Sequence, residues 1–173
     1  MTAGDGSHGG DVSITGKEVT LRSGGVIDAT GEFSGGDVYF GGGWQGGGDL
    51  RQATFATVES GAIIDVSALN TGDAGTIVVW SDVTDVESVT RAQGTLLARG
   101  GQEGGDGGRI ETSGHFLEVA GVSGDASASD GLGGEWLFDP FDIVINDSGS
   151  DSGGSFTGGT WTCLLYTSPS PRD

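Results

Sequence analysis

The sequence predicts an all-β fold, a β-solenoid in which short strands stack as successive rungs. Three patterns predict it: a glycine doublet that returns before apolar runs, a second apolar unit between the doublets, and alternation of apolar with polar residues inside the runs. The doublets recur roughly every 25 to 40 residues, a period typical of solenoids and other arrays. The doublet runs are 9–14, 35–40, 107–112 and 133–138, with a variant at 74–79 and a last copy beginning at Gly158.

Each doublet run opens with a glycine turn and continues as a strand in which every second residue is apolar. Because successive side chains of a strand point to opposite faces, one set of residues should enter the core while the intervening set points outward. The expected core residues are Val12, Ile14, Val38, Phe40 and Ile110, and the expected outward residues are Ser13, Tyr39 and Glu111.

The second unit lies between the doublets, at 25–30, 62–67 and, more loosely, 94–99. A rung of about 20 to 25 residues, the scale that such arrays use, gives about six or seven rungs before Thr162. Two glycine- or acid-rich loops, 41–48 and 82–87, depart from the pattern and are expected to be insertions that bulge from one face. The glycine doublets suit corners where a neighbouring rung lies close.

The last eleven residues, 163–173, break the glycine-rich texture abruptly. They are the translation of DNA that looks like a transposase-type sequencing adapter, and a native tail is the less favoured alternative. Such segments are excluded from fold reasoning. We therefore expect a solenoid repeat fragment at 1–162, belonging to a longer natural protein, and a non-native tail at 163–173.

Composition narrows the classes of function. The chain has 7 basic against 25 acidic residues, a net charge of −18, which argues against binding nucleic acid through its phosphates. The same charge disfavours attraction to an anionic membrane surface. No apolar run approaches the ~18 residues of a membrane span, and the single cysteine lies in the tail, so no disulfide framework is expected. These features favour a soluble, extracellular protein.

Five motifs between residues 72 and 145 occur in an order and spacing that resemble the repeat region of filamentous-haemagglutinin-type exoproteins, the secreted partners of two-partner secretion systems. The motifs are 75–82, 98–101, 104–108, 110–114 and 136–145. The resemblance implies a right-handed parallel β-helix, export through an outer-membrane transporter of the Gram-negative type, and a surface-bound or released adhesin. The secretion-signal domain that such proteins carry near their start is not identified in the sequence.

Two pairs of carboxylates are candidate sites. Asp139 and Asp142 flank Pro140 and Phe141, as a pair for acid–base chemistry could. We favour a turn at the end of a rung, because the pair lies inside the repeat motif. Asp28 and Asp65 occupy equivalent places in two rungs; a cation between them is the alternative to two carboxylates that face water.

No metal site or cofactor is predicted. The run 104–108 resembles calcium-binding nonapeptide repeats but occurs only once and lacks tandem copies. His8 and His115 are far apart in the sequence and have no ligand spacing, so each is interpreted as a surface histidine.

Trp44, inside the glycine-rich loop 41–48, is the one candidate ligand-binding residue. An exposed tryptophan there could stack on a sugar ring. The favoured alternative is that it plugs the end of a rung.

The first functional hypothesis is a non-catalytic adhesin fragment that presents ridges and loops to glycans or partner cells. The alternative is a carbohydrate-active enzyme, a polysaccharide lyase or hydrolase, on the same scaffold. That alternative needs carboxylates and basic residues that converge on one rung face, and Arg99 and Arg109 are the basic residues nearest an acidic loop. A purely mechanical spacer is not separated from the first hypothesis by sequence.

Overall fold

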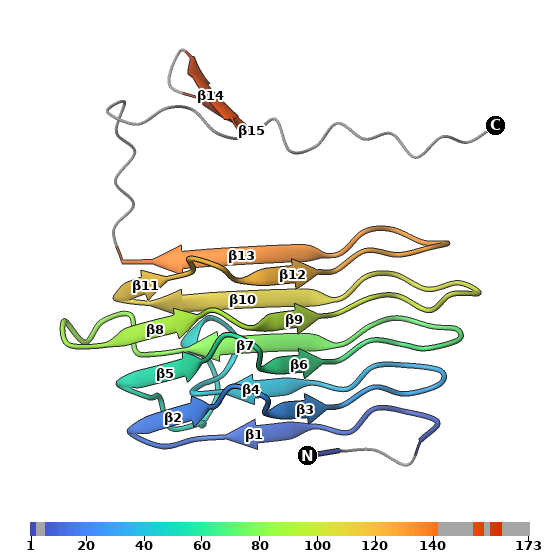
Figure 1. Ribbon diagram of the computed structural model, residues 1–173, viewed down its shortest axis with the longest axis horizontal. Coiled ribbons are helices and arrows are strands. Elements are labelled where there is room, and N and C mark those ends of the chain that lie inside the picture. The colour runs from blue at the N-terminus through green and yellow to red at the C-terminus, as the bar shows by residue number, and fades with distance from the viewer. Residues whose placement is uncertain (3–5, 142–153, 158–159, 164–173) are drawn as a thin grey trace. The chain divides into compact units, whose positions relative to one another are not determined.

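The computed structural model describes residues 1–2, 6–141, 154–157 and 160–163. Up to Pro140 the chain forms three parallel sheets, seen edge on as stacked rungs in Figure 1. The first sheet contains β1 (Val12–Ile14), β4 (Val38–Phe40), β7 (Thr76–Trp80), β10 (Arg109–Gly114) and β13 (Glu135–Pro140). The second contains β2 (Glu18–Leu21), β5 (Phe55–Val58), β8 (Val89–Ala92) and β11 (Phe116–Glu118). The third contains β3 (Val26–Asp28), β6 (Ile63–Asp65), β9 (Thr95–Leu97) and β12 (Ser123–Asp125).

Each rung contributes one strand to each sheet, which confirms the predicted parallel β-helix. The described residues hold four complete rungs and the first strand of a fifth, fewer than the six or seven expected before Thr162. The reason is rung length. Register pairs Val12 with Val38, then with Ile77, Ile110 and Trp136, so successive rungs take 26, 39, 33 and 26 residues. Loops between the strands, not the strands themselves, supply the extra residues.

The core is a set of columns that run along the stack. Val38, Ile77 and Ile110 are fully buried and lie in register, with Phe40 and Val79 forming a neighbouring column. The intervening residues Tyr39, Val78 and Glu111 are also in register and form a separate column on the other face of the sheet. The alternation predicted from the sequence is therefore confirmed. Burial of the apolar columns is the main stabilising contribution, at about 25 cal/mol per Å² of apolar surface.

Glycine is required where arms of successive rungs touch. A Cβ at Gly35 would lie 1.8 Å from the carbonyl oxygen of Val66, and one at Gly107 would lie 1.9 Å from that of Ala126. Both neighbours are backbone atoms of the next rung, which cannot move without shifting the stack. The expected use of glycine at close rung contacts is confirmed at these two positions.

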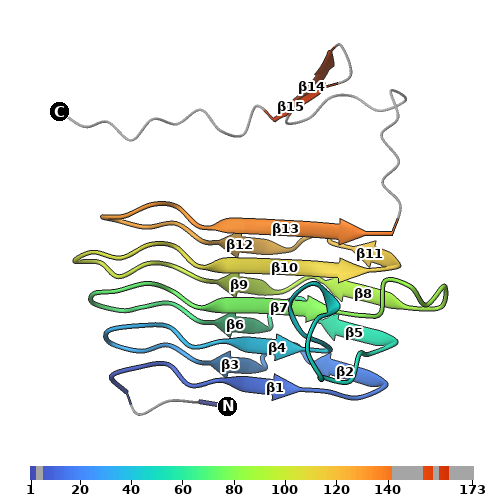
Figure 2. The same ribbon diagram turned by 180° about the vertical axis from the view of Figure 1, so that it is seen from behind.

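The two predicted insertions both connect the first sheet to the second. Residues 41–54 link β4 to β5 and include the short 3₁₀ helix η1 (Trp44–Gly46). Figure 2 shows this loop crossing the face of β4 and β7. Residues 81–88 link β7 to β8, with turns closed by Asp82, whose Oδ1 accepts the Thr84 N–H (2.9 Å), and by Asp85, whose Oδ1 accepts the Glu87 N–H (3.0 Å).

Beyond the solenoid, β14 (Gly154–Thr157) and β15 (Thr160–Cys163) form an antiparallel pair in a second unit, Ile143–Asp173. The predicted extent of the repeat fragment, 1–162, and the non-native tail, 163–173, stay predictions. No helix in the described part of the chain is long and apolar enough to cross a membrane.

Candidate functional site

The 41–54 loop is clamped to the outer face of the first sheet. Trp80 is the anchor: it points out of the sheet, yet only 2% of it is exposed because the loop covers it. Its indole N–H donates to Oε1 of Gln52 (3.0 Å), and the Gln52 side-chain amide donates to the carbonyl oxygen of Gly46 (3.2 Å). A Cβ on Gly42 would lie 2.3 Å from the Trp80 ring, so the backbone lies directly on the indole.

Trp44 lies against the side of the stack, not at the end of a rung. Its ring is half-buried, and the guanidinium carbon of Arg109 sits 4.6 Å from the ring centroid, a cation–π contact between the loop and β10. Arg109 therefore lies over one face of the Trp44 ring. Stacking of Trp44 on a sugar stays a prediction.

The environment of Glu111 differs from the one expected from the sequence. It points outward, as predicted, but the loop buries it completely. Its Oε2 accepts the Gln45 backbone N–H (2.8 Å), and its Oε1 accepts the Ser113 hydroxyl (2.8 Å). Burial raises the pKa of the Glu111 carboxyl above its ordinary value, while these two hydrogen bonds act in the opposite direction. The length of the insertion was the only sequence signal that an outward residue could be covered.

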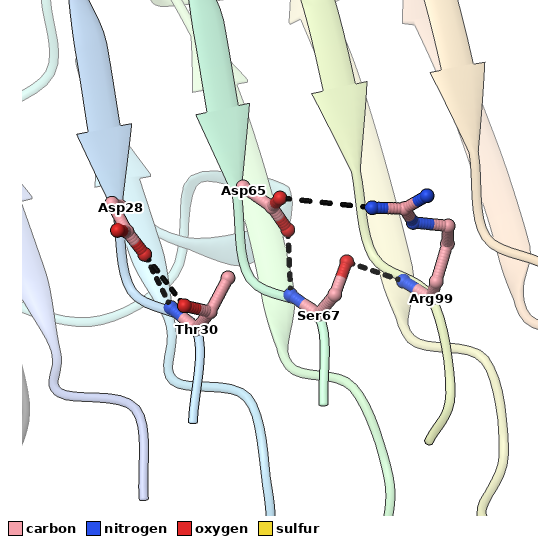
Figure 3. A network of polar contacts seen from close by, with 5 residues as sticks. All are labelled: Asp28, Thr30, Asp65, Ser67 and Arg99. Carbon is pink, nitrogen blue, oxygen red and sulfur yellow. Dashed lines mark hydrogen bonds and ion pairs between the residues drawn. The ribbon is translucent and has the colours of Figure 1, made fainter. Parts of the chain in front are cut away.

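The carboxylates of the third sheet lie in a column at the strand ends (Figure 3). Asp28 and Asp65 are in register, which confirms their equivalence. Each closes its own turn: Oδ1 of Asp28 accepts the N–H (3.0 Å) and hydroxyl (2.7 Å) of Thr30, and Oδ1 of Asp65 accepts the Ser67 N–H (2.9 Å). Asp125 repeats this with the Ser127 N–H (3.0 Å). The column is thus a repeated turn in which a carboxylate holds the chain two residues later.

The third rung breaks this column. Leu97 occupies the aspartate place, and Arg99 occupies the place of Ser67. The Arg99 backbone N–H donates to the Ser67 hydroxyl (3.1 Å), and one guanidinium nitrogen lies 3.9 Å from Oδ2 of Asp65 (Figure 3). The structure therefore brings one carboxylate and one basic side chain together from two successive rungs, whereas the enzyme alternative requires several carboxylates and basic residues on one rung face.

The remaining sequence candidates are dispersed. Asp139 lies in β13, and its suggested partner Asp142 lies outside the described residues. In the 104–108 run, Oδ1 of Asp106 accepts the Leu132 N–H of the next rung (2.8 Å), so this carboxylate links two rungs. His8 precedes β1 and His115 lies between β10 and β11, in different rungs. Within the described ranges no group of three or more His, Cys, Asp or Glu side chains gathers as a metal site would need.

Comparison with solved structures gives a match that covers most of this chain. The chain is similar to the HMW1 secretion domain from Haemophilus influenzae, whose crystal structure is known. The two share 34% sequence identity, and their structures superpose with a TM-score of 0.59. The match covers 76% of this chain and 32% of that chain. The predicted resemblance to two-partner secretion exoproteins is confirmed. No family model matches the chain, and no match was found among curated proteins.

The matching structure is described as a secretion domain, whereas the motifs in the sequence resemble the repeat region of such exoproteins. No secretion-signal domain was identified in the sequence. This chain covers about a third of the length of the matching structure.

Proposed function

We propose that this chain is part of the secretion domain of a two-partner exoprotein that is exported through an outer-membrane transporter. The observation that carries the proposal is the 34% identity to a secretion domain, over 76% of the chain, in the same rung architecture. The exoprotein would then work outside the cell or at the surface of a Gram-negative bacterium.

The composition supports passage through a transporter. Cysteine is absent from residues 1–162, so no disulfide needs to form or break during export. Each rung pairs mainly with its neighbours, and such arrays can propagate folding from one end. A chain that emerges in an extended state could therefore add rungs one after another outside the cell.

The role of the whole exoprotein is proposed to be adhesive, toward glycans or partner cells. Adhesion by a repeat array is multivalent, with weak individual contacts that combine. The alternative, a polysaccharide lyase or hydrolase on the same scaffold, finds support only in the Arg99–Asp65 approach. It is disfavoured because Asp65 is held by its own turn through the Ser67 N–H.

An export assay tests the proposal. The full chain, preceded by a signal peptide, is produced in a Gram-negative host with the outer-membrane transporter encoded beside its gene, and with an empty vector as control. We expect the chain in the medium only when the transporter is present. Equal amounts in the medium without it, or retention in the periplasm with it, would contradict the proposed export route.

A separate assay tests the enzyme alternative. The purified full chain is incubated with a panel of polysaccharides, and new reducing ends and unsaturated products are measured. We expect neither. Cleavage that is abolished in Arg99→Ala and kept in Arg91→Ala, whose ion pair with Glu118 lies in the second sheet, would establish the enzyme instead.

A further inference from the structure

A hollow of about 440 Å³ lies at the corner where the chain leaves the third sheet. It spans the turns after β6, β9 and β12, so three successive rungs contribute to it. Six of the residues that line it are Ser67, Leu69, Arg99, Gln102, Ser127 and Ser129. Ligand-binding pockets are usually about 300–1,000 Å³, which is enough here for one or two sugar units.

The break in the aspartate column creates the hollow's chemistry. In the first, second and fourth rungs, a carboxylate closes the turn onto the residue two places later. In the third rung no carboxylate is available, and Arg99 projects over the preceding rung toward Asp65 (Figure 3). Their separation of 3.9 Å exceeds hydrogen-bond length, so the guanidinium donors are not consumed by this contact.

Three further polar side chains of the hollow are also available. The Gln102 amide and the Ser127 and Ser129 hydroxyls make no hydrogen bond with any other described residue. They supply both donors and acceptors. Leu69, 46% exposed, adds an apolar surface at the same place.

Charge decides the class of ligand. Arg99 is the one basic side chain among the described residues that line the hollow, and the Asp65 carboxylate offsets it. The chain carries a net charge of −18. A polyanion would meet repulsion, whereas a neutral ligand rich in hydroxyl groups would use the donors and acceptors without that cost.

We propose that the corner hollow around Arg99 binds a neutral saccharide. The Arg99 guanidinium and Gln102 amide donate to sugar oxygens, the Ser127 and Ser129 hydroxyls donate or accept, and Leu69 contacts the C–H face of the ring. The inference rests on the proposed adhesive role for its biological meaning, but its test does not depend on export.

The test is calorimetric titration of the purified full chain with neutral oligosaccharides of glucose, galactose, mannose and N-acetylglucosamine, together with sialylated and uronic-acid oligosaccharides. We expect at least one neutral oligosaccharide to bind, and its Kd to rise at least tenfold in Arg99→Ala. Ser129→Trp, which fills the hollow from an exposed position, should raise the Kd as much. Arg91→Ala, also an exposed arginine in one ion pair, should leave it unchanged.

Three results would overturn the inference: no neutral oligosaccharide binds, the acidic ones bind more tightly, or neither Arg99→Ala nor Ser129→Trp weakens binding. Circular dichroism and urea unfolding of each variant show whether it keeps the β-helix. If Arg99→Ala abolishes saccharide binding but whole cells that display the exoprotein still adhere, the site stands and adhesion uses another surface. If the chain binds saccharide but the transporter assay fails, the site stands and the export proposal is wrong.

Discussion

Two departures from the rung repeat, the 41–54 insertion and the third-rung substitution at Leu97 and Arg99, behave in opposite ways. The insertion folds back on the first sheet and supplies partners for what it covers: Gln45 for the Glu111 carboxylate and Gln52 for the Trp80 indole. At the substitution a repeating turn lacks its carboxylate, and the hollow beside it contains Gln102, Ser127 and Ser129, whose side chains make no hydrogen bond with another described residue.

We therefore interpret the insertion as a structural departure from the repeat and the substitution as a functional one. A buried polar group without a partner costs about 1–3 kcal/mol, so the closed insertion must satisfy its own groups to persist. Exposed polar groups do not have this cost, because water can hydrogen-bond to them, and they stay available for a ligand. The two regions should therefore respond oppositely to mutation: the insertion should lose stability, and the hollow should lose binding.

The largest expected effect is a loss of stability at the 41–54 insertion. Trp80→Ala removes a buried indole that anchors the loop, and large-to-small changes of this kind lower the free energy of unfolding by about 3–5 kcal/mol. Urea unfolding monitored by circular dichroism measures it. A loss below about 1 kcal/mol would mean that the loop is not held as described.

The next largest effect is expected from a pair of glycine variants that tests the close contact between successive rungs. Gly35→Ala places a methyl group 1.8 Å from the Val66 carbonyl oxygen, and overpacking of this kind costs about 1–3 kcal/mol. Gly133→Ala, where a Cβ meets nothing within 4 Å, should be near neutral. Equal urea midpoints for the two variants would contradict the register of the arms.

A smaller, pH-dependent effect is expected from Glu111. Because burial raises its pKa in the folded chain, protonation favours folding: this stabilisation is full below the unfolded pKa and is lost as pH rises through the folded pKa. Glu111→Gln should therefore gain stability relative to the parent chain as pH increases from about 4. Unfolding midpoints of both chains across pH 4–8 give the difference, and a difference independent of pH would rule out the buried carboxylate.

The smallest effects on stability are expected at the hollow around Arg99. Arg99→Ala and Arg91→Ala each remove a side chain that is nearly half exposed, at 46% and 44%, and exposed ion pairs contribute about 0–1 kcal/mol. Both should unfold within about 0.5 kcal/mol of the parent chain. If Arg99→Ala lowered the free energy of unfolding as much as Trp80→Ala, Arg99 would be a structural residue, and the two regions would not differ in the way proposed.

Most of the fold could be predicted because the rung pattern is local. Glycine doublets and two-residue alternation assign Val38 and Ile110 to the core without knowledge of the loops, and the structure places both in one column with Ile77. The number of rungs could not be predicted in the same way. Loop lengths vary between rungs, and a glycine-rich loop such as 41–54 has no periodicity from which its path can be derived.

The sites were harder to predict because they depend on which rungs become neighbours. Asp28 and Asp65 were paired correctly, since both follow the same apolar motif. The burial of Glu111 under Gln45, 66 residues away, and the contact of Arg109 with Trp44 depend on the folded path of the insertion. The hollow at Arg99 became visible only when three turns were stacked.

Hydrogen exchange measured by mass spectrometry, on the full chain with and without a neutral oligosaccharide that it binds, tests the contrast most directly. We predict that the 41–54 loop is protected in both conditions, and that the turns after β9 and β12 gain protection only with the sugar. Fast exchange of the loop in both conditions, or protection by the sugar around Trp44 instead of Arg99, would contradict the account.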